Sequence, residues 1–104
     1  MGSTVVAAAL EVPGAVRSVA VQAGSGASAL GGSGADAWVT GEASHHEVLE
    51  ANARGSSVIL AEHSNTERGF LPSMRDALLE RAGAQGLQFE VHISVTDEDP
   101  LCVV

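Results

Sequence analysis

The segment "SSVILAEHSNTERGF", residues Ser56–Phe70, carries the pattern that decides the fold of this chain. It opens with a short apolar run that includes Val58 and Leu60, which is typical of a strand buried in a parallel sheet. His63 follows almost directly, and Glu67 stands four residues later. In open α/β sheets, ligands bind beyond the carboxyl ends of the strands. The segment therefore predicts an α/β fold with a functional edge at His63 and Glu67.

Strand-like and helix-like segments alternate along the rest of the chain. Five strands are expected, at residues Thr4–Leu10, Arg17–Gly24, Ala35–Glu42, Ser56–His63 and Gln88–Val95. Helices are expected at Ser44–Gly55 and Leu71–Gly86, with a shorter one over Ala27–Leu30. Strands and helices that alternate with short links favour parallel strands joined by right-handed crossovers. We predict one α/β domain over residues 1–104, a three-layer sandwich with a mostly parallel sheet of about five strands and two to three helices.

The last strand-like segment, Gln88–Val95, has a different pattern from the others. Its apolar residues alternate strictly with polar ones, which predicts a half-exposed edge strand. Pro72 lies where a helix would have its first turn, a position that suits proline. The Leu71–Gly86 segment is therefore expected to form a helix separate from whatever follows His63.

The composition excludes several classes of protein. The chain has 5 basic residues, all arginine, against 13 acidic ones, for a formal net charge of −8. Nucleic-acid surfaces and anionic membranes both require clustered positive charge, so neither is an expected partner. No apolar run approaches the ~20 residues that span a bilayer. The start of the chain is a poor signal peptide, and the lone Cys102 is compatible with a reducing compartment. We expect the cytoplasm, with the nucleus as a second location.

Three strand ends carry polar residues that could form a site. Gly24, Ser25 and Gly26 follow one strand, Glu42 and then His46 follow the next, and His63 and Glu67 follow the third. Imidazole with carboxylate suits zinc, iron, manganese or nickel, whereas a histidine disfavours a calcium site. Two ligands do not complete a metal site, because a catalytic zinc usually has three from the protein.

Each motif also has a purely structural interpretation. Glu67 completes an S-x-x-E capping box with Ser64, although Pro72 would then lie deep inside the helix. Ser44 and Glu47 fit a capping box equally well. The "AGSG" segment that ends at Gly26 is either an anion-binding loop or a tight turn before a helix.

Four stretches together resemble one family. "AGSG", "TGEASHHEVLEA", "VILAEHSNTERGFL" and "DEDPLCVV" are similar to the C-terminal part of the NIF-three-like family, and "EHSNTERGFL" is most like its animal branch. Bacterial members are often named GTP cyclohydrolase I type 2 homologues. The resemblance covers nearly the whole chain from about Arg17 onward.

The resemblance implies a dinuclear metal centre, two metals per subunit in a full-length protein. Its His-x-x-x-Glu motif would be His63 and Glu67, and the other ligands would come from an N-terminal part that is absent here. Glu42 and His46 would line the cleft or support a ligand. This chain alone is then expected to bind metal weakly or not at all. The resemblance also implies homo-oligomers and protein partners in transcriptional regulation.

Three functions are therefore in competition. The first is a metal-dependent hydrolase domain that is incomplete in this form. The second is a non-catalytic module that binds other proteins. The third is a small-ligand domain that binds an anion through Gly24, Ser25 and Gly26.

Overall fold

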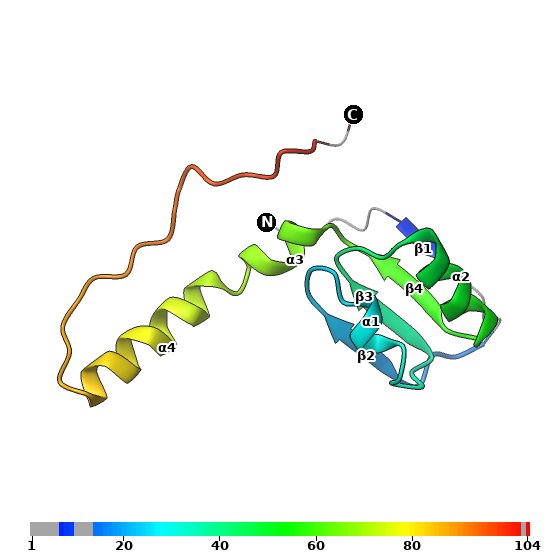
Figure 1. The fold of residues 1–104 in the computed structure, drawn as a ribbon, viewed down its shortest axis with the longest axis horizontal. Coiled ribbons are helices and arrows are strands. Elements are labelled where there is room, and N and C mark those ends of the chain that lie inside the picture. The colour runs from blue at the N-terminus through cyan, green and yellow to red at the C-terminus, as the bar shows by residue number, and fades with distance from the viewer. Residues whose placement is uncertain (1–6, 10–13, 103) are drawn as a thin grey trace. The chain divides into compact units, whose positions relative to one another are not determined.

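The structure is a computed structural model that describes residues 7–9, 14–102 and 104. Its contacts divide the chain into two compact units, Met1–Glu67 and Arg68–Val104, and each is described by itself. The first unit holds the sheet and the second holds the longest helix (Figure 1). Among the described residues, no helix combines the length and the hydrophobicity that a membrane crossing requires.

The first unit is built on a four-stranded sheet with strand order β1-β4-β3-β2. The strands are β1 (Ala7–Ala9), β2 (Val19–Gln22), β3 (Ala37–Thr40) and β4 (Ser57–Leu60). The β2, β3 and β4 strands are parallel, whereas β1 runs antiparallel to β4. The α/β class and the mostly parallel sheet are thus confirmed. Of the predicted first strand, residues 4–6 and 10 lie outside the described residues.

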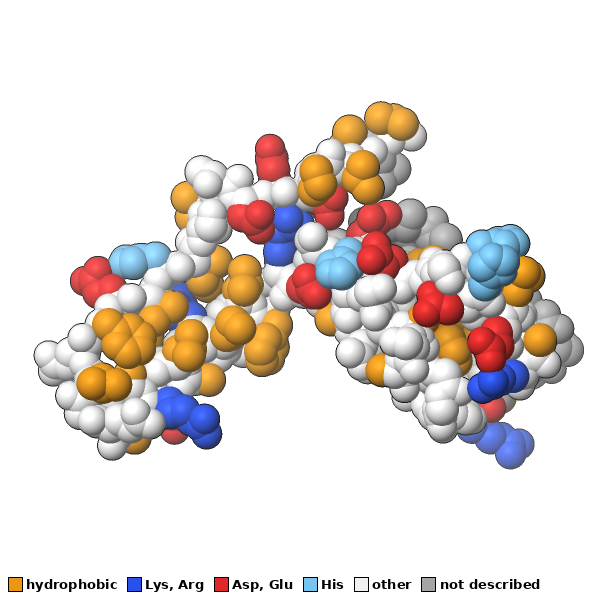
Figure 2. Space-filling view, in the orientation of Figure 1, with side chains coloured by type: hydrophobic (Ala, Val, Ile, Leu, Met, Phe, Trp, Pro, Cys, Tyr) orange, Lys and Arg blue, Asp and Glu red, His pale blue; other side chains and the backbone are white. Residues whose placement is uncertain are grey.

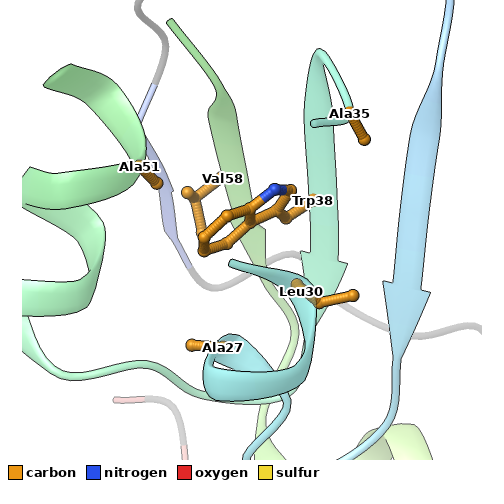
Figure 3. Packing of buried hydrophobic residues seen from close by; sticks show 6 residues of the cluster. All are labelled: Ala27, Leu30, Ala35, Trp38, Ala51 and Val58. Atoms are coloured by element: carbon orange, nitrogen blue, oxygen red, sulfur yellow. The ribbon is translucent and has the colours of Figure 1, made fainter. Parts of the chain in front are cut away.

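Two helices connect the parallel strands and cover one face of the sheet. They are α1 (Ala27–Leu30), between β2 and β3, and α2 (His45–Ala53), between β3 and β4. Their buried side chains pack on the central strands, as Figure 3 shows. The core cluster consists of Ala27, Leu30, Ala35, Trp38, Ala51 and Val58.

The other face of the sheet is much more open within this unit. Side chains alternate between the two faces of a strand. Ala20 packs against the core, so its neighbours Val19 and Val21 point the other way, and they are 55% and 71% exposed. Among the described residues of this unit, α1 and α2 thus share one face of the sheet.

A capping box begins α2, as the sequence predicted. The Ser44 amide donates to Glu47 Oε2 (2.7 Å), and the Glu47 amide donates to Ser44 Oγ (3.3 Å). These bonds lower the pKa of Glu47, chiefly through the Ser44 amide. Two of the helix-start amides thereby gain partners that the helix itself cannot supply.

The short helix α3 (His63–Arg68) follows β4 and stops before Gly69. Because α3 already begins at His63, Ser64 is helical and is not the cap that an S-x-x-E box would require. The next helix, α4 (Leu71–Ala84), starts separately, with Phe70 as its N-cap and Pro72 in its first turn. The separation of the two helices matches the constraint that proline imposes on a helix interior.

In the second unit, α4 leaves large apolar side chains exposed. Phe70, Met74 and Leu78, spaced one turn apart, are 63%, 45% and 47% exposed. Figure 2 shows hydrophobic side chains gathered over this helix. A shallow groove of about 190 Å³ runs between α4 residues and the later segment, with Val91 and Ile93 on the segment side.

The predicted strand at Gln88–Val95 is wrong. The segment forms neither helix nor strand, and Phe89 and Val95 are 50% and 96% exposed. A strand exists only when its backbone groups pair with a neighbouring strand, and no such neighbour is present in the described part of this unit. Farther on, Arg68 Nε donates to Asp97 Oδ2 at 2.8 Å.

Candidate functional site

His63 lies between two carboxylates beyond the carboxyl ends of β3 and β4. Its Nδ1 is 2.9 Å from Glu42 Oε1, and its Nε2 is 3.2 Å from Glu67 Oε1. The three side chains are about half exposed, at 44%, 56% and 51%. The structure thus brings together three residues from two strand ends.

The backbone around β4 sets the direction of His63. Glu62 has a φ of +69°, a left-handed conformation that non-glycine residues seldom adopt. Its carbonyl oxygen accepts from the Thr66 amide at 3.2 Å, which closes the first turn of α3. The turn at Glu62 therefore starts the helix at His63, and Glu67 follows one turn later on the same face.

Two glycines allow the three loops of the site to approach one another. A Cβ at Gly24, whose φ is +68°, would lie 2.5 Å from Glu67 Oε1 and 3.1 Å from His63 Nε2. A Cβ at Gly41 would lie 2.6 Å from the Gly24 carbonyl oxygen and 2.8 Å from that of Glu62. Any side chain at Gly41 would therefore collide with two backbone segments.

Threonine side chains bind the glycine loop and were not predicted from the sequence. The Gly24 amide donates to Thr66 Oγ1 (2.9 Å), and Thr66 Oγ1 donates to the His63 carbonyl (2.7 Å). Thr40, buried at the end of β3, accepts from the Gly26 amide (3.1 Å). The position of Thr66 in the turn after His63 could have indicated a role in the site. Its contact with Gly24, however, joins residues that are 42 positions apart in the sequence.

These bonds occupy two of the backbone amides in the Gly24, Ser25 and Gly26 loop. An anion cradle needs free backbone amides, and the amides of Gly24 and Gly26 already donate to threonines. The loop also packs closely against the ends of two other strands, and anion binding by it stays a prediction.

Charge around the imidazole raises the pKa of His63 above its ordinary value. The largest contribution is the hydrogen bond to the Glu42 carboxylate, and the negative charge of Glu67 adds to it. Partial burial acts in the opposite direction, because it disfavours the charged imidazole.

His46 is exposed in the first turn of α2. Its ring lies edge-on to that of His45, with centroids 5.9 Å apart. Over the described residues, the structure records no contact between His46 and the His63 cluster. The resemblance implied that His46 would lie near the cleft, and that role stays a prediction.

The donor arrangement limits what the described residues can hold. The two carboxylates lie at different nitrogens of the His63 ring, so each ring nitrogen faces a single carboxylate. The described part of the chain contains no group of three His, Cys, Asp or Glu side chains arranged for a metal ion. Chemically, the cluster offers one nitrogen and one carboxylate oxygen to a cation, with a second carboxylate behind the ring.

Comparison with known proteins gives concordant results. The chain is 52% identical over 98 residues to NIF3-like protein 1 of Bos taurus, covering 91% of this chain and 24% of that protein. It is 51% identical over 92 residues to NIF3-like protein 1 of Homo sapiens, covering 86% of this chain and 23% of that protein. The chain thus spans about a quarter of the length of these relatives, in their C-terminal part.

A solved structure of a Bacillus cereus protein related to NIF3 matches the fold. The TM-score is 0.73 at 28% identity, covering 96% of this chain and 29% of that one. The family model Duf34/NIF3 (NGG1p interacting factor 3) matches residues 1–100. The quoted motifs and the three parallel strands agree with these matches. The chain belongs to the Duf34/NIF3 family.

Proposed function

We propose that this chain supplies the His63–Glu67 half of a metal centre for a divalent transition metal. The observation that carries the proposal is the pairing of His63 Nε2 with Glu67 Oε1 at 3.2 Å, one turn apart on α3. A neutral imidazole nitrogen and a carboxylate oxygen are ligands that zinc, iron, manganese and nickel accept.

The space beside this pair supports the assignment. Gly24 has no Cβ, and a Cβ there would fill the volume next to Glu67 Oε1 and His63 Nε2. The Gly24 backbone is held in place by Thr66, so the space beside His63 and Glu67 is a fixed feature of the first unit. The donors are half exposed, which leaves a route for further ligands from outside this chain.

When bound, a metal of this kind supplies Lewis acidity for hydrolysis. The residues of this chain would contribute binding and orientation: His63 and Glu67 would hold the cation, and Gly24 would leave space for it. In a full-length relative, the centre would be completed by ligands from the part that this chain does not contain. We therefore propose hydrolase chemistry for the whole protein and an incomplete centre for this chain.

Calorimetric titration of the chain with zinc and with manganese tests the metal proposal. We expect weak binding, because two donors contribute less binding free energy than a complete set. His63→Ala and Glu67→Gln should each remove this binding. His92→Ala and Glu90→Gln are matched controls, since His92 Nε2 and Glu90 Oε2 form a second exposed pair at 2.9 Å.

Tight binding would contradict the half-site in a specific way. Submicromolar, stoichiometric binding by the monomeric chain would require a third donor, and His46 would be the first residue to replace. Equal loss of binding in His63→Ala and His92→Ala would place the metal elsewhere.

A second candidate function is protein interaction in transcriptional regulation. Two observations favour it: the Saccharomyces cerevisiae relative is named NGG1-interacting factor 3, and α4 exposes Phe70, Met74 and Leu78 along one side. Titration of the chain with purified NGG1p distinguishes the functions. If α4 is the binding surface, Leu78→Glu weakens that interaction while His63→Ala leaves it unchanged. If neither NGG1p nor metal binds, both functions fail for this chain.

A further inference from the structure

The two carboxylate contacts of His63 differ in kind. Nδ1 makes a hydrogen bond of 2.9 Å with Glu42 Oε1, whereas Nε2 lies 3.2 Å from Glu67 Oε1, at ion-pair distance. A neutral imidazole carries a single N–H, so one ring nitrogen donates and the other accepts. In the neutral ring, the shorter contact favours Nδ1 as the nitrogen that keeps the proton.

Glu42 is well placed to impose this choice, because its backbone is fixed by contacts of its own at the end of β3. The Glu42 amide donates to the Gly24 carbonyl at 2.9 Å. Gly41, directly before it, packs so tightly against Gly24 and Glu62 that there is no room for a Cβ. Glu67 shares a helix with His63 and moves with it, whereas Glu42 reaches the ring from the end of a different strand.

We propose that Glu42 is a positioning residue that holds neutral His63 in the Nδ1–H tautomer, so that the Nε2 lone pair is directed at the space beside Glu67 and Gly24. The purpose of this arrangement rests on the proposed metal function. Metal-binding histidines almost always donate their other ring N–H to a carboxylate, a carbonyl or a water, which fixes both tautomer and ring orientation. Glu42 supplies such a carboxylate.

The alternative is an ordinary surface ion pair. Glu42 and His63 are half exposed, and exposed ion pairs contribute little to stability. Such a pair needs no preferred tautomer in the neutral state, and replacing its carboxylate leaves the other nitrogen unaffected. The tautomer of the neutral ring therefore separates a positioning role from a merely structural one.

The test is long-range proton–nitrogen correlation NMR on the metal-free, nitrogen-15-labelled chain at alkaline pH, where the imidazole is neutral. The His63 signals are assigned by their loss in His63→Ala. In the unaltered chain we expect a protonated, pyrrole-type shift at Nδ1 and an unprotonated, pyridine-type shift at Nε2.

Three variants complete the measurement. Glu42→Gln preserves side-chain size but removes the charge, and Glu42→Leu removes the acceptor as well. Both should move the two nitrogen shifts of His63 toward the averaged values of a mixed tautomer population. Glu90→Gln makes the same change beside His92 and should leave the His63 shifts unaltered. Circular dichroism of each variant confirms that the fold is retained.

Zinc titration of the same samples adds the link to metal binding. Glu42→Gln should weaken zinc binding by about 10- to 100-fold, as is typical when the support of a ligand histidine is lost. A protonated Nε2 in the unaltered chain or unchanged shifts in both Glu42 variants would overturn the inference, and so would an unchanged zinc affinity in Glu42→Gln if the unaltered chain binds zinc. If the unaltered chain binds no zinc but keeps the tautomer, the positioning role stands and the proposed metal function fails for this chain.

Discussion

The two compact units of the chain bury their apolar side chains to very different extents. In the first, Leu30, Trp38 and Val58 are 5%, 4% and 0% exposed. In the second, Met74 and Leu78 of α4 are nearly half exposed. The first unit has a sheet face that collects side chains from several elements, whereas α4 lines an open groove together with an extended segment.

This contrast shows that a segment can form regular secondary structure without packing into a core. Local signals are sufficient to start and stop α4, as its first-turn proline and the left-handed Gly86 at its end illustrate. Tertiary packing normally provides most of the stability of a helix. The site lies in the unit that has that packing, where strand ends and glycines fix its side chains.

Removing the centre of the first core should have the largest effect. Trp38→Ala is expected to lower the free energy of unfolding by about 3–5 kcal/mol, because a large buried ring is lost and a cavity remains. Urea unfolding followed by circular dichroism measures the change. A midpoint equal to that of the unaltered chain would show that the first unit does not depend on this core.

The same substitution in both units tests the contrast directly. Leu30→Ala in α1 should lower the free energy of unfolding by about 2–5 kcal/mol, as expected for a buried leucine. Leu78→Ala in α4 should change it by less than about 1 kcal/mol, since the side chain is already half exposed. Equal losses in the two variants would mean that α4 packs against something as extensive as the core of the first unit.

Glycine substitutions should differ in sign between the units. Gly41→Ala is expected to destabilise by about 1–3 kcal/mol, because its Cβ would meet backbone atoms of two other loops. Gly83→Ala, inside α4 with nothing within 4 Å of the added Cβ, should stabilise by roughly 0.5–1 kcal/mol through helix propensity. Thermal unfolding of both variants gives the comparison, and a harmless Gly41→Ala would show that the three site loops are not closely packed.

The smallest expected effect is a pH dependence that originates at His63. Its pKa in the folded chain is raised, chiefly by the bond to Glu42. The stabilisation is therefore fully present below the unfolded pKa of about 6.5, and it is lost as the pH rises through the folded value.

Urea unfolding of the metal-free chain across this pH window should show that decline. The decline should be reduced in Glu42→Gln, whereas Glu90→Gln, the same charge change in the second unit, should retain it. Identical pH profiles for the unaltered chain and Glu42→Gln would rule out the contribution.

The strand ends of the first unit could be predicted from the sequence because apolar runs and periodicity identify parallel strands. That prediction also placed His63, Glu67 and Glu42 at one edge, where the structure brings them together. The capping box of α2 was equally predictable, since Ser44 and Glu47 interact across a single turn.

Other features depend on contacts that no local pattern records. Gly41 and Thr66 meet loops that are distant in the sequence, so their roles appear only in the folded chain. The Gln88–Val95 segment has the alternation of a strand, but alternation describes the two faces of a segment and not the presence of a pairing partner. His46 has metal-binding chemistry, yet its cap-adjacent position in α2 gives it no described contact with the cluster.

Trp38 also gives the first unit its own optical reporter. The chain has one tryptophan and no tyrosine, so its intrinsic fluorescence on indole excitation originates entirely from Trp38. The indole is 4% exposed, and within the described residues its Nε1 has no hydrogen-bond partner, so its emission should be blue-shifted and respond to the first water that enters the core. Far-ultraviolet dichroism, in contrast, includes a large contribution from the fourteen residues of α4. Two melting curves recorded on one sample would therefore reveal whether the chain unfolds in one step or in two.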